Sequence, residues 1–372
     1  MKKAFKFRIY PNNDQINQIQ RTFGCCRFVY NYFLNQRINH YEKCGDSLNF
    51  ALMCQGITVL KNNNDKMWLR EVDSTALQSS VKDLDMAYQN FFRRKKHGKK
   101  PGFPKFKSKK NMHKSYKTKN VDMRIKVYER HIKLPKLGLV RAAISKVVEG
   151  RILNATISQS PSGKYFVSLC CTDVSICKYS YTGAKVGLDL GITTLLITSD
   201  GVEYSNRKHL KQSEMKLAKL QRQLSRKQIG SNNRNKARVK VARLQEKIAN
   251  KRMDVLHKLS TQLVKDYDVI CVEDLAVKNM IRNHNLAKSI SDASWGELNR
   301  QLRYKCEWQN KEYVKINRAF ASSQICNNCG YKNSDVKDLS VRLWKCPECE
   351  SLLNRDENAA INILHEGLRL IA

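Results

Sequence analysis

The pattern of apolar and polar residues predicts an N-terminal region of strands and helices and a C-terminal region in which the two alternate. Residues 5–10, FKFRIY, alternate as a strand does, and a proline ends the pattern. Apolar residues then recur at helical spacing over residues 14–24, 29–41 and 74–92, and Gly24 is expected to end the first helix. The pattern therefore predicts a strand followed by a helical segment.

Alternation returns over residues 121–172, where proline and glycine turn signals separate several expected antiparallel strands. Together with the first strand, these strands are expected to form a small barrel. From Lys185 onward the pattern predicts two strands, a helical hairpin over residues 206–265, a strand in DVICVED and a long helix over residues 292–311. This order is typical of an α/β domain, so the predicted fold class is α/β with several domains.

The composition adds a partner to this picture. The chain has 372 residues, of which 41% are hydrophobic, so it is long enough for two or three domains with real cores. Its 69 lysines and arginines exceed its 33 aspartates and glutamates by 36. Such an excess within a folded body indicates a polyanionic partner, and nucleic acid is favoured over an acidic membrane surface.

The chain shows no sequence signal for export or membrane insertion. No apolar run reaches the roughly 18 residues of a membrane span, and the N-terminal residues lack the apolar core of a signal peptide. The 13 cysteines are an odd number, and several lie within apolar runs. This usage fits a reducing compartment, so a cytoplasmic protein without a membrane partner is expected.

Residues 91–141 form a basic segment with 19 lysines and arginines and only two acids, Asp122 and Glu129. A run of like charge is often only a solvated face or a linker. Here aromatic residues, among them Phe103 and Phe106, interleave with the cations, which favours a nucleic-acid surface. The predicted contacts in its first part are Arg93, Arg94, Lys95, Lys96, Lys99, Lys100, Lys105 and Lys107.

Two acids interrupt apolar strands of the C-terminal region. Asp189 lies in VGLDLGITTLLITSDG and Glu273 at the end of VICVED. A charge in such a strand is costly unless it is paired or bound to a metal ion, although each acid alone is also compatible with a sheet edge or a salt bridge. Asp356 opens the alanine-rich helix in NRDENAAINIL, and small alanines allow a helix to pack closely on a sheet. We therefore expect the three acids to converge.

Three converging carboxylates repel one another unless divalent cations neutralise them. Coordination by oxygen alone suits Mg²⁺ or Mn²⁺. A pair of such ions is the usual arrangement in phosphodiester hydrolysis, where one ion activates water and the other stabilises the leaving oxygen. Asp189, Glu273 and Asp356 are therefore predicted to be catalytic and to hold Mg²⁺ or Mn²⁺.

Four cysteines form two matched pairs, Cys326 with Cys329 and Cys346 with Cys349, and 16 residues separate the pairs. This spacing predicts a tetrahedral zinc site with four thiolate ligands. Four ligands leave no position for water, so the zinc is expected to be structural rather than catalytic. Redox-active dithiols fit two matched pairs poorly.

The chain resembles the TnpB (OrfB) family of insertion-sequence proteins, RNA-guided DNA endonucleases with a RuvC-type, RNase H-like nuclease domain. Members of this family are relatives of the type V CRISPR effectors. The matching segments follow one another in order over nearly the whole chain. They are FRIYPNNDQINQIQRTFGCCRFVYNYFLNQ, STALQSSVKDLDMAYQNFFRR with KPGFPKFKSKK, GLDLGITTLL, VICVEDLAVKNM, SISDASWGELNRQLRYKCEW, ASSQICNNCG and WKCPECESLLNRDENAAINIL.

The resemblance implies a fold of three parts. Residues 1–11 and 121–180 would form a wedge-like β-barrel, and residues 12–120 a helical recognition lobe. Residues 181–372 would form a RuvC-like nuclease domain, with a zinc-binding insert at residues 321–352.

The resemblance also implies the function of a transposon-encoded RNA-guided DNA endonuclease that cuts by two-metal hydrolysis. Asp189, Glu273 and Asp356 take the family's catalytic places by motif position. A guide RNA from the transposon end would pair with double-stranded target DNA beside a short motif, with one copy of the protein in the complex. Gln78 and Lys82 lie where the family reads that motif.

Two positions depart from the family pattern. Glu350 stands where a glycine commonly follows the last cysteine, and Asn354 stands where the family often has an acid two residues before Asp356. Neither change removes an acid of the triad, so activity is expected to be retained. The fit of the zinc element to the active site stays open at this point.

Three other functions compete with the guided nuclease. An RNA-guided, repressor-like DNA binder that does not cut should have lost at least one acid, and all three are present. A transposase that joins DNA ends would need strand-transfer machinery, for which the sequence shows no separate region. A generic zinc-containing nucleic-acid module would not explain three acids in this order.

Overall fold

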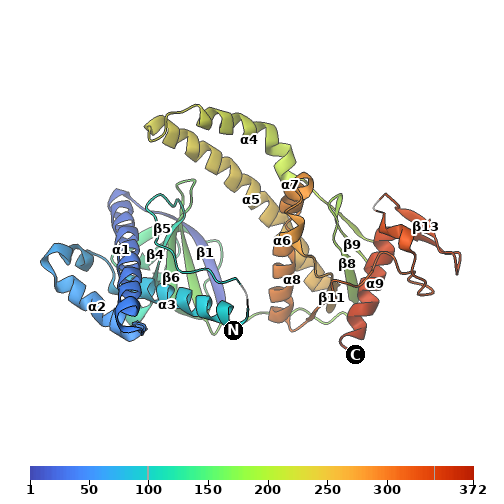
Figure 1. The fold of residues 1–372 in the computed structure, drawn as a ribbon, viewed down its shortest axis with the longest axis horizontal. Coiled ribbons are helices and arrows are strands. Elements are labelled where there is room, and N and C mark those ends of the chain that lie inside the picture. Colours follow the sequence, from blue (N-terminus) through green and yellow to red (C-terminus); the bar gives the residue numbers. More distant parts are fainter. Residues whose placement is uncertain (99, 339) are drawn as a thin grey trace. The chain divides into compact units, whose positions relative to one another are not determined.

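The structure is a computed structural model that describes residues 1–98, 100–338 and 340–372. The chain divides into two compact units, unit 1 (residues 1–175) and unit 2 (residues 176–372), which Figure 1 shows in sequence colours. Lys99, one of the predicted nucleic-acid contacts, lies outside the described residues.

Unit 1 contains a seven-stranded antiparallel sheet with the strand order β2-β6-β7-β1-β5-β4-β3. In the pairing of β1 with β7, Phe5 lies opposite Leu169 and Phe7 opposite Val167. Alternate residues of β1 are buried, as its sequence predicts. The strands are β1 (Lys3–Tyr10), β2 (Lys114–Lys119), β3 (Lys126–Val127), β4 (His131–Leu134), β5 (Gly138–Ala143), β6 (Arg151–Gln159) and β7 (Tyr165–Thr172).

The edge strand β2 lies in the part of the chain that the sequence analysis counted with the helical segment. It pairs with β6, and its Tyr116 and Thr118 are buried, whereas Ser115, Lys117 and Lys119 at the alternate positions are exposed. The sequence pattern did not predict this strand, because the lysines make KSYKTK look like part of the basic segment. Only its residue-by-residue alternation indicates a strand.

The helices of unit 1 share one apolar core with the sheet. They are α1 (Asn13–Cys44), α2 (Phe50–Asn62), the 3₁₀ segments η1 (Asn64–Glu71) and η2 (Val121–Met123), and α3 (Ser74–Lys96). The prediction that Gly24 ends a helix is wrong, because α1 runs through it without a break. A glycine inside a helix costs about 1 kcal/mol, and the burial of Phe23, Cys25 and Cys26 around it outweighs that cost.

Unit 2 contains a five-stranded sheet with the order β10-β9-β8-β11-β12. The strands β8, β11 and β12 run parallel, whereas β9 pairs antiparallel with β8, and β10 pairs antiparallel with β9. The strands are β8 (Lys185–Asp189), β9 (Thr194–Thr198), β10 (Glu203–Ser205), β11 (Val269–Val272) and β12 (Glu312–Lys315).

Helices pack on both faces of this sheet. Ile270 and Val272 of β11 share a core with α5 and α8, whereas Cys271 between them packs with Ile363 of α9. Because successive strand residues point to opposite faces, α9 covers the face opposite to α5 and α8. The helices are α4 (His209–Ser225), α5 (Asn232–Asp266), α6 (Val277–Met280), α7 (His284–Ala293), α8 (Trp295–Gln309) and α9 (Arg355–Arg369).

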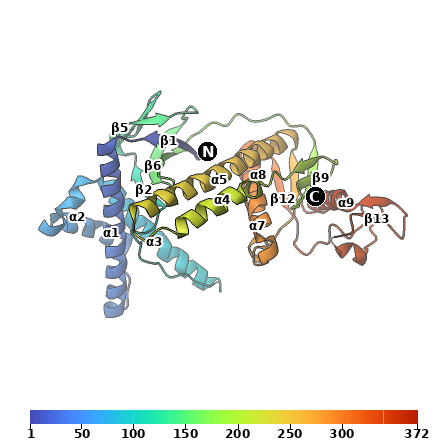
Figure 2. The ribbon, with the colours of Figure 1, turned by 90° about the horizontal axis from the view of Figure 1, so that it is seen from above.

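Both helical predictions for unit 2 are confirmed, with a difference in where the second helix begins. The expected hairpin is present, since α4 and α5 run side by side in both views (Figure 1, Figure 2). The expected helix over residues 292–311 is present as α8, although it begins only at Trp295, because Ser294 adopts the left-handed φ of 54° and breaks the chain between α7 and α8. No proline or glycine marks this break at Ser294 itself, so the sequence pattern did not show it.

The segment before α9 carries the cysteine pairs and a small two-stranded sheet, β13 (Leu343–Lys345) and β14 (Leu352–Asn354), with the 3₁₀ segment η3 (Ser334–Lys337). Its small core contains Cys326, Cys346, Val336, Trp344 and Leu353. Within the part of the chain that the structure describes, no helix is both long and apolar enough to cross a membrane.

The contact of α9 with β8 leads to a first prediction. A Cβ atom built on Gly187 of β8 would lie 2.0 Å from the carbonyl oxygen of Ala360 and 2.7 Å from the amide nitrogen of Leu364, so only glycine fits there. Gly187→Ala is therefore expected to destabilise unit 2 by about 2 kcal/mol or more, as overpacking does. Denaturant unfolding followed by circular dichroism measures the change.

Gly24→Ala provides the control for this prediction. A Cβ atom at Gly24 meets nothing within 4 Å, and the residue lies inside α1. The same chemical change is therefore expected to stabilise the protein by about 0.5–1 kcal/mol. Equal stability of the Gly187→Ala variant and the wild type would contradict the close contact of α9 with β8.

Candidate active site and cysteine cluster

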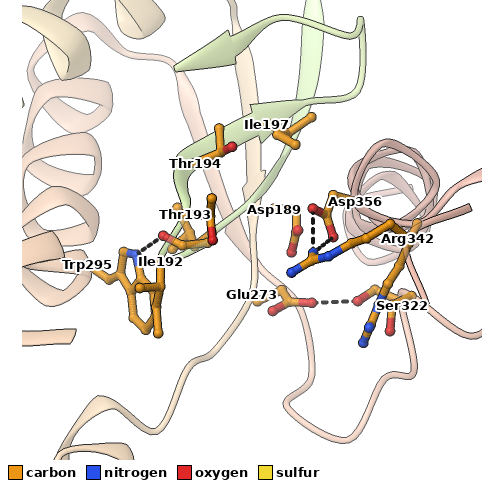
Figure 3. A pocket seen from close by; sticks show the side chains of 14 residues that line it. Asp189, Ile192, Thr193, Thr194, Ile197, Glu273, Trp295, Ser322, Arg342 and Asp356 are labelled. Atoms are coloured by element: carbon orange, nitrogen blue, oxygen red, sulfur yellow. Dashed lines mark hydrogen bonds and ion pairs between the residues drawn. The ribbon is translucent and has the colours of Figure 1, made fainter. Parts of the chain in front are cut away.

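Three separate segments bring the three predicted acids to one place in unit 2 (Figure 3). Asp189 is the last residue of β8, and Glu273 follows directly after β11. These neighbouring strands are parallel with Leu188 opposite Val272, so both acids emerge at the same edge of the sheet. Asp356 is the second residue of α9, which packs on β8.

The acids face a cavity of about 310 Å³, whose wall contains both charged and apolar side chains. Trp295 closes one side, where its indole nitrogen donates a hydrogen bond to the carbonyl oxygen of Gly191 at 3.3 Å. The full lining is Asp189, Leu190, Gly191, Ile192, Thr193, Thr194, Ile197, Glu273, Trp295, Ser322, Ser323, Arg342, Arg355 and Asp356.

The electrostatics of the cavity show that the acids interact. The pKa of Asp189 is raised to about 8, mainly by burial and also by the charges of Glu273 and Asp356, against the opposing charge of Arg355. Burial also raises the pKa of Glu273, against the stabilising hydrogen bond from Ser322. A bound cation would be favourable here, because its positive charge offsets the repulsion among the three carboxylates and the cost of burying the Asp189 carboxylate.

Arg342 holds Asp356 by an ion pair that the sequence analysis did not predict. Its Nη1 atom lies 3.1 Å from Oδ1 and 3.0 Å from Oδ2 of Asp356 (Figure 3). Among the described residues, the carboxylate oxygens of Asp189, Glu273 and Asp356 do not all lie within 4.8 Å of one another. The three acids thus line one cavity, and the carboxylate of Asp356 forms an ion pair with Arg342 rather than converging with the carboxylates of Asp189 and Glu273.

Two further residues of the cavity were also missed. The hydroxyl of Ser322 donates to Oε1 of Glu273 at 2.5 Å, and the buried Arg355 donates to the carbonyl oxygen of Asp338 at 2.7 Å. Neither residue stands out in the sequence, since a serine in ASSQIC is unremarkable and one arginine among 69 cationic residues carries no signal. Only the position of Arg355 beside Asp356 offered a clue.

Asp274 does not belong to the cavity although it follows Glu273. Its carboxylate pairs with Lys315 and with Arg318, whose Nη2 atom lies 2.5 Å from Oδ2. These cations lower the pKa of Asp274 through hydrogen bonds and charge, with burial acting in the opposite direction. The neighbouring acid therefore has a structural ion pair, which separates it from the triad.

The four cysteines of the matched pairs form one cluster. All four sulfur atoms lie within 4.8 Å of one another, with 3.6 Å between Cys326 and Cys349 and 3.6 Å between Cys329 and Cys346. These separations are too long for disulfides, and four convergent sulfur ligands are the donor set of a structural zinc site. Backbone hydrogen bonds shape both turns, from Gly330 N to Cys326 O and from Glu350 N to Cys346 O.

Both departures from the family pattern have a structural explanation. Glu350 adopts the left-handed φ of 54°, which glycine accepts at lower cost, and its side chain forms an ion pair with Lys345 at 2.8 Å. Asn354 is the N-cap of α9, where its side chain accepts hydrogen bonds from the amides of Asp356 and Glu357. Asparagine and aspartate cap helices about equally well, so this exchange preserves the start of α9.

Two asparagines of α9 connect the cysteine cluster to the acid cavity through hydrogen bonds. Asn358 accepts a hydrogen bond from the amide of Asn327 at 2.9 Å and donates to the carbonyl oxygen of Ile325 at 2.7 Å. Asn362, one turn further along, donates to the carbonyl oxygens of Ile325 at 2.6 Å and Ser322 at 2.8 Å. The helix that carries Asp356 thus also positions the first cysteine knuckle and the loop of Ser322.

The predicted nucleic-acid contacts lie in unit 1, on α3 and the loop after it. Gln78 is half-buried, whereas Lys82 is exposed and pairs with Asp85 at 3.0 Å. The cations in the last turn of α3 are exposed, and so are the described ones of the loop. Cations at a helix C-terminus also complement the helix dipole, so their exposure alone does not assign a role. These residues are Arg93, Arg94, Lys95, Lys96, Lys100, Lys105 and Lys107.

Comparisons with known families match three parts of the chain. Residues 170–284 match the OrfB_IS605 family, described as "Probable transposase". Residues 295–363 match the "Cas12f1-like, TNB domain", and residues 1–46 match the "Helix-turn-helix domain" of the same OrfB family. Residues 1–46, which match the helix-turn-helix model, fold in this structure as β1 and the continuous helix α1.

Whole proteins and a solved structure are similar over nearly the full length. "Putative RNA-guided DNA endonuclease" of Streptomyces pristinaespiralis is 38% identical, over 99% of this chain and 90% of the relative. "Putative RNA-guided DNA endonuclease InsQ" of Escherichia coli K12 is 34% identical, over 100% and 93%. A chain in the "Cryo-EM structure of the Cas12f1-sgRNA-target DNA complex" matches with a TM-score of 0.55 over 98% of both chains at 14% identity, which shows a similar fold. As its motifs predicted, the chain belongs to the TnpB (OrfB) family of insertion-sequence proteins.

Proposed function

We propose that this protein is an RNA-guided DNA endonuclease and that Asp189, Glu273 and Asp356 are its catalytic acids. The observation that carries the proposal is the meeting of three acids from three distant segments in one cavity. Relatives aligned over nearly the whole chain bear the name of RNA-guided DNA endonucleases, which supports the same activity. A repressor-like binder would not need to keep all three acids in the cavity.

The donor set of the cavity fits Mg²⁺ or Mn²⁺. The three acids offer only oxygen ligands, and their mutual repulsion is the cost that a divalent cation removes. Bound at Asp189, Glu273 and Asp356, such ions would supply activation of water and stabilisation of the leaving oxygen. The two-ion arrangement is part of the proposal.

The remaining residues of the cavity would position and balance these acids. Ser322 fixes the direction of Glu273 through its hydrogen bond, and Trp295 shields one side from water. Arg342 and Arg355 place two guanidinium groups in the cavity, where a phosphodiester would meet them. A phosphate would compete with Asp356 for Arg342, so entry of the substrate would free a carboxylate for a cation.

We extend the proposal to the roles of the two units. Unit 2 would be the RNase H-like, RuvC-type nuclease domain with the zinc-binding insert at residues 321–352, and unit 1 the wedge-like barrel and recognition lobe. The likeness in fold to Cas12f1 supports this division. A guide RNA from the transposon end would pair with the target DNA, and one copy of the protein would act in the complex.

The net charge of +36 supports two nucleic-acid partners. Gln78 and Lys82 on α3 would read the short motif beside the target, and the basic turn that follows would contact backbone phosphates. Sequencing the RNA that co-purifies with the protein would define the guide. A plasmid library with randomised flanks would then define the motif.

The first prediction from this proposal concerns the acids. Asp189→Asn and Glu273→Gln are each expected to slow guided DNA cleavage at least about 100-fold, because loss of even a supporting group at a metal site costs up to that much. Binding of guide RNA and target DNA should be unchanged, as measured by gel shift. The control is Glu357→Gln, which changes an exposed acid next to Asp356 and should leave cleavage intact. Wild-type cleavage by either triad variant would refute the assignment.

The second prediction concerns the cysteine cluster. Cys346→Ser removes one of the four sulfur ligands, so the variant is expected to lose zinc and to become sensitive to proteolysis in the segment before α9. Elemental analysis and limited proteolysis measure these effects. Cys177→Ser, at an exposed thiol outside the cluster, should keep zinc at the wild-type level. Unchanged zinc content in Cys346→Ser would rule out the proposed site.

A further inference from the structure

A second polar cavity, of about 170 Å³, lies in unit 1 between α1 and the loop that joins α3 to β2. Its volume far exceeds the roughly 15 Å³ that one water molecule needs. The charged and titratable nitrogen-bearing side chains around it are Arg27, Lys107, Lys109, His113 and Lys114, and no aspartate or glutamate is among the lining residues. A cavity with several cations and no acid has the polarity of an anion site.

Within the part of the chain that the structure describes, ion pairs do not neutralise the cations of this cavity. Among the described residues, Arg27, Lys107, Lys109 and Lys114 form no ion pair. Arg27 is half-buried and its guanidinium makes no hydrogen bond within the described chain. A partly desolvated guanidinium without an acceptor is unfavourable, and a bound anion would remove that cost.

Lys107 is held in place without an ion pair among the described residues, although the charge of Asp83 acts on its ammonium. The side chain of Asn31 in α1 binds the backbone of Lys107 through two hydrogen bonds. Its amide oxygen accepts from the Lys107 amide at 2.8 Å, and its amide nitrogen donates to the Lys107 carbonyl at 3.0 Å. The Lys107 ammonium lies 4.0 Å from the ring centroid of Tyr30. Partial desolvation lowers the pKa of Lys107, although the residue as a whole is exposed, and the charge of Asp83 acts in the opposite direction.

The loop that forms the other wall is also fixed by its own hydrogen bonds. The Ser108 hydroxyl accepts from the amide of Lys110 at 3.1 Å, and the Asn111 side chain accepts from the amide of His113 at 3.0 Å. Lys114 at the start of β2 donates to Gln20 of α1 at 3.2 Å. The wall is therefore attached to α1 at two points, through Asn31 and through Gln20, so the cations are held around a formed cavity.

We propose that this cavity binds one backbone phosphate of a nucleic acid, with Arg27 and Lys107 as its main contacts. An arginine fork and a lysine point charge are complementary donors for a phosphate. The proposed function supplies the nature of the ligand, since a protein of net charge +36 that works on nucleic acid presents its cations to phosphodiesters. The same chemistry serves a guide RNA or a target DNA, and the experiment separates them.

The test measures binding rather than cutting, so that it does not depend on the nuclease assignment. Arg27→Gln, Lys107→Gln and the double variant are made in full-length protein that also carries Asp189→Asn, so that no probe is cut. Affinity for a short single-stranded RNA and for a short DNA duplex, both of mixed sequence, is measured between about 50 and 200 mM KCl. Lys43→Gln is the control, because Lys43 is an exposed cation on the same helix outside the cavity.

Each single variant is expected to weaken binding of at least one probe about fivefold or more. It should also reduce the slope of log K against log salt by up to about 0.7 for RNA or 0.9 for DNA, the value of one phosphate. Because both side chains would hold the same phosphate, the double variant should lose no more slope than one phosphate is worth. An effect on RNA alone identifies the guide as the source, and an effect on DNA alone identifies the target.

Wild-type affinity and slope of the double variant on both probes would overturn the proposal, and so would an equal loss in the Lys43→Gln control. If Arg27→Gln does not fold by thermal melting, Lys109→Gln replaces it, because Lys109 is exposed and lines the same cavity. A failure here leaves the acid cavity untouched. Conversely, absence of guided cleavage would not change these binding results.

Discussion

The close contact of α9 with β8 is the constraint on which the candidate site depends. Gly187 leaves room for the backbone of α9 at Ala360 and Leu364, and any side chain at that position would push the helix away. The parallel pairing of β8 with β11 already places Asp189 beside Glu273. The contact at Gly187, together with the packing of Ile363 and Gly367 of α9 on Cys271 of β11, adds Asp356 as the third acid of the cavity.

Hydrogen bonds from side chains of α9 also connect the cysteine cluster to the same cavity. Asn358 and Asn362 bind the first cysteine knuckle and the loop of Ser322, while β14 leads from the second knuckle directly into Asp356. A zinc ion there would hold both knuckles together and thereby fix Ser322 against Glu273 and Arg342 against Asp356. The structural site would thus act on the reactive one by restricting the backbone around it.

Sequence reasoning predicted the site residues that a local sequence pattern marks. Asp189 and Glu273 stood out as charges after apolar runs, and the cysteine pairs stood out by their spacing, because both signals are local in the chain. Arg342 and Ser322 gave no such signal, since their meaning comes only from the side chains they face in the folded unit. The continuation of α1 through Gly24 was missed for a related reason, because tertiary packing overrode the low helix propensity of glycine.

The central claim is that the three acids jointly hold divalent cations. Crystals of the full-length protein grown with Mn²⁺ in place of Mg²⁺ would test it through anomalous scattering at the manganese edge. The account predicts peaks coordinated by carboxylate oxygens of Asp189, Glu273 and Asp356, with Arg342 displaced from Asp356. Peaks elsewhere, or none at saturating Mn²⁺ with the Arg342–Asp356 ion pair intact, would contradict it.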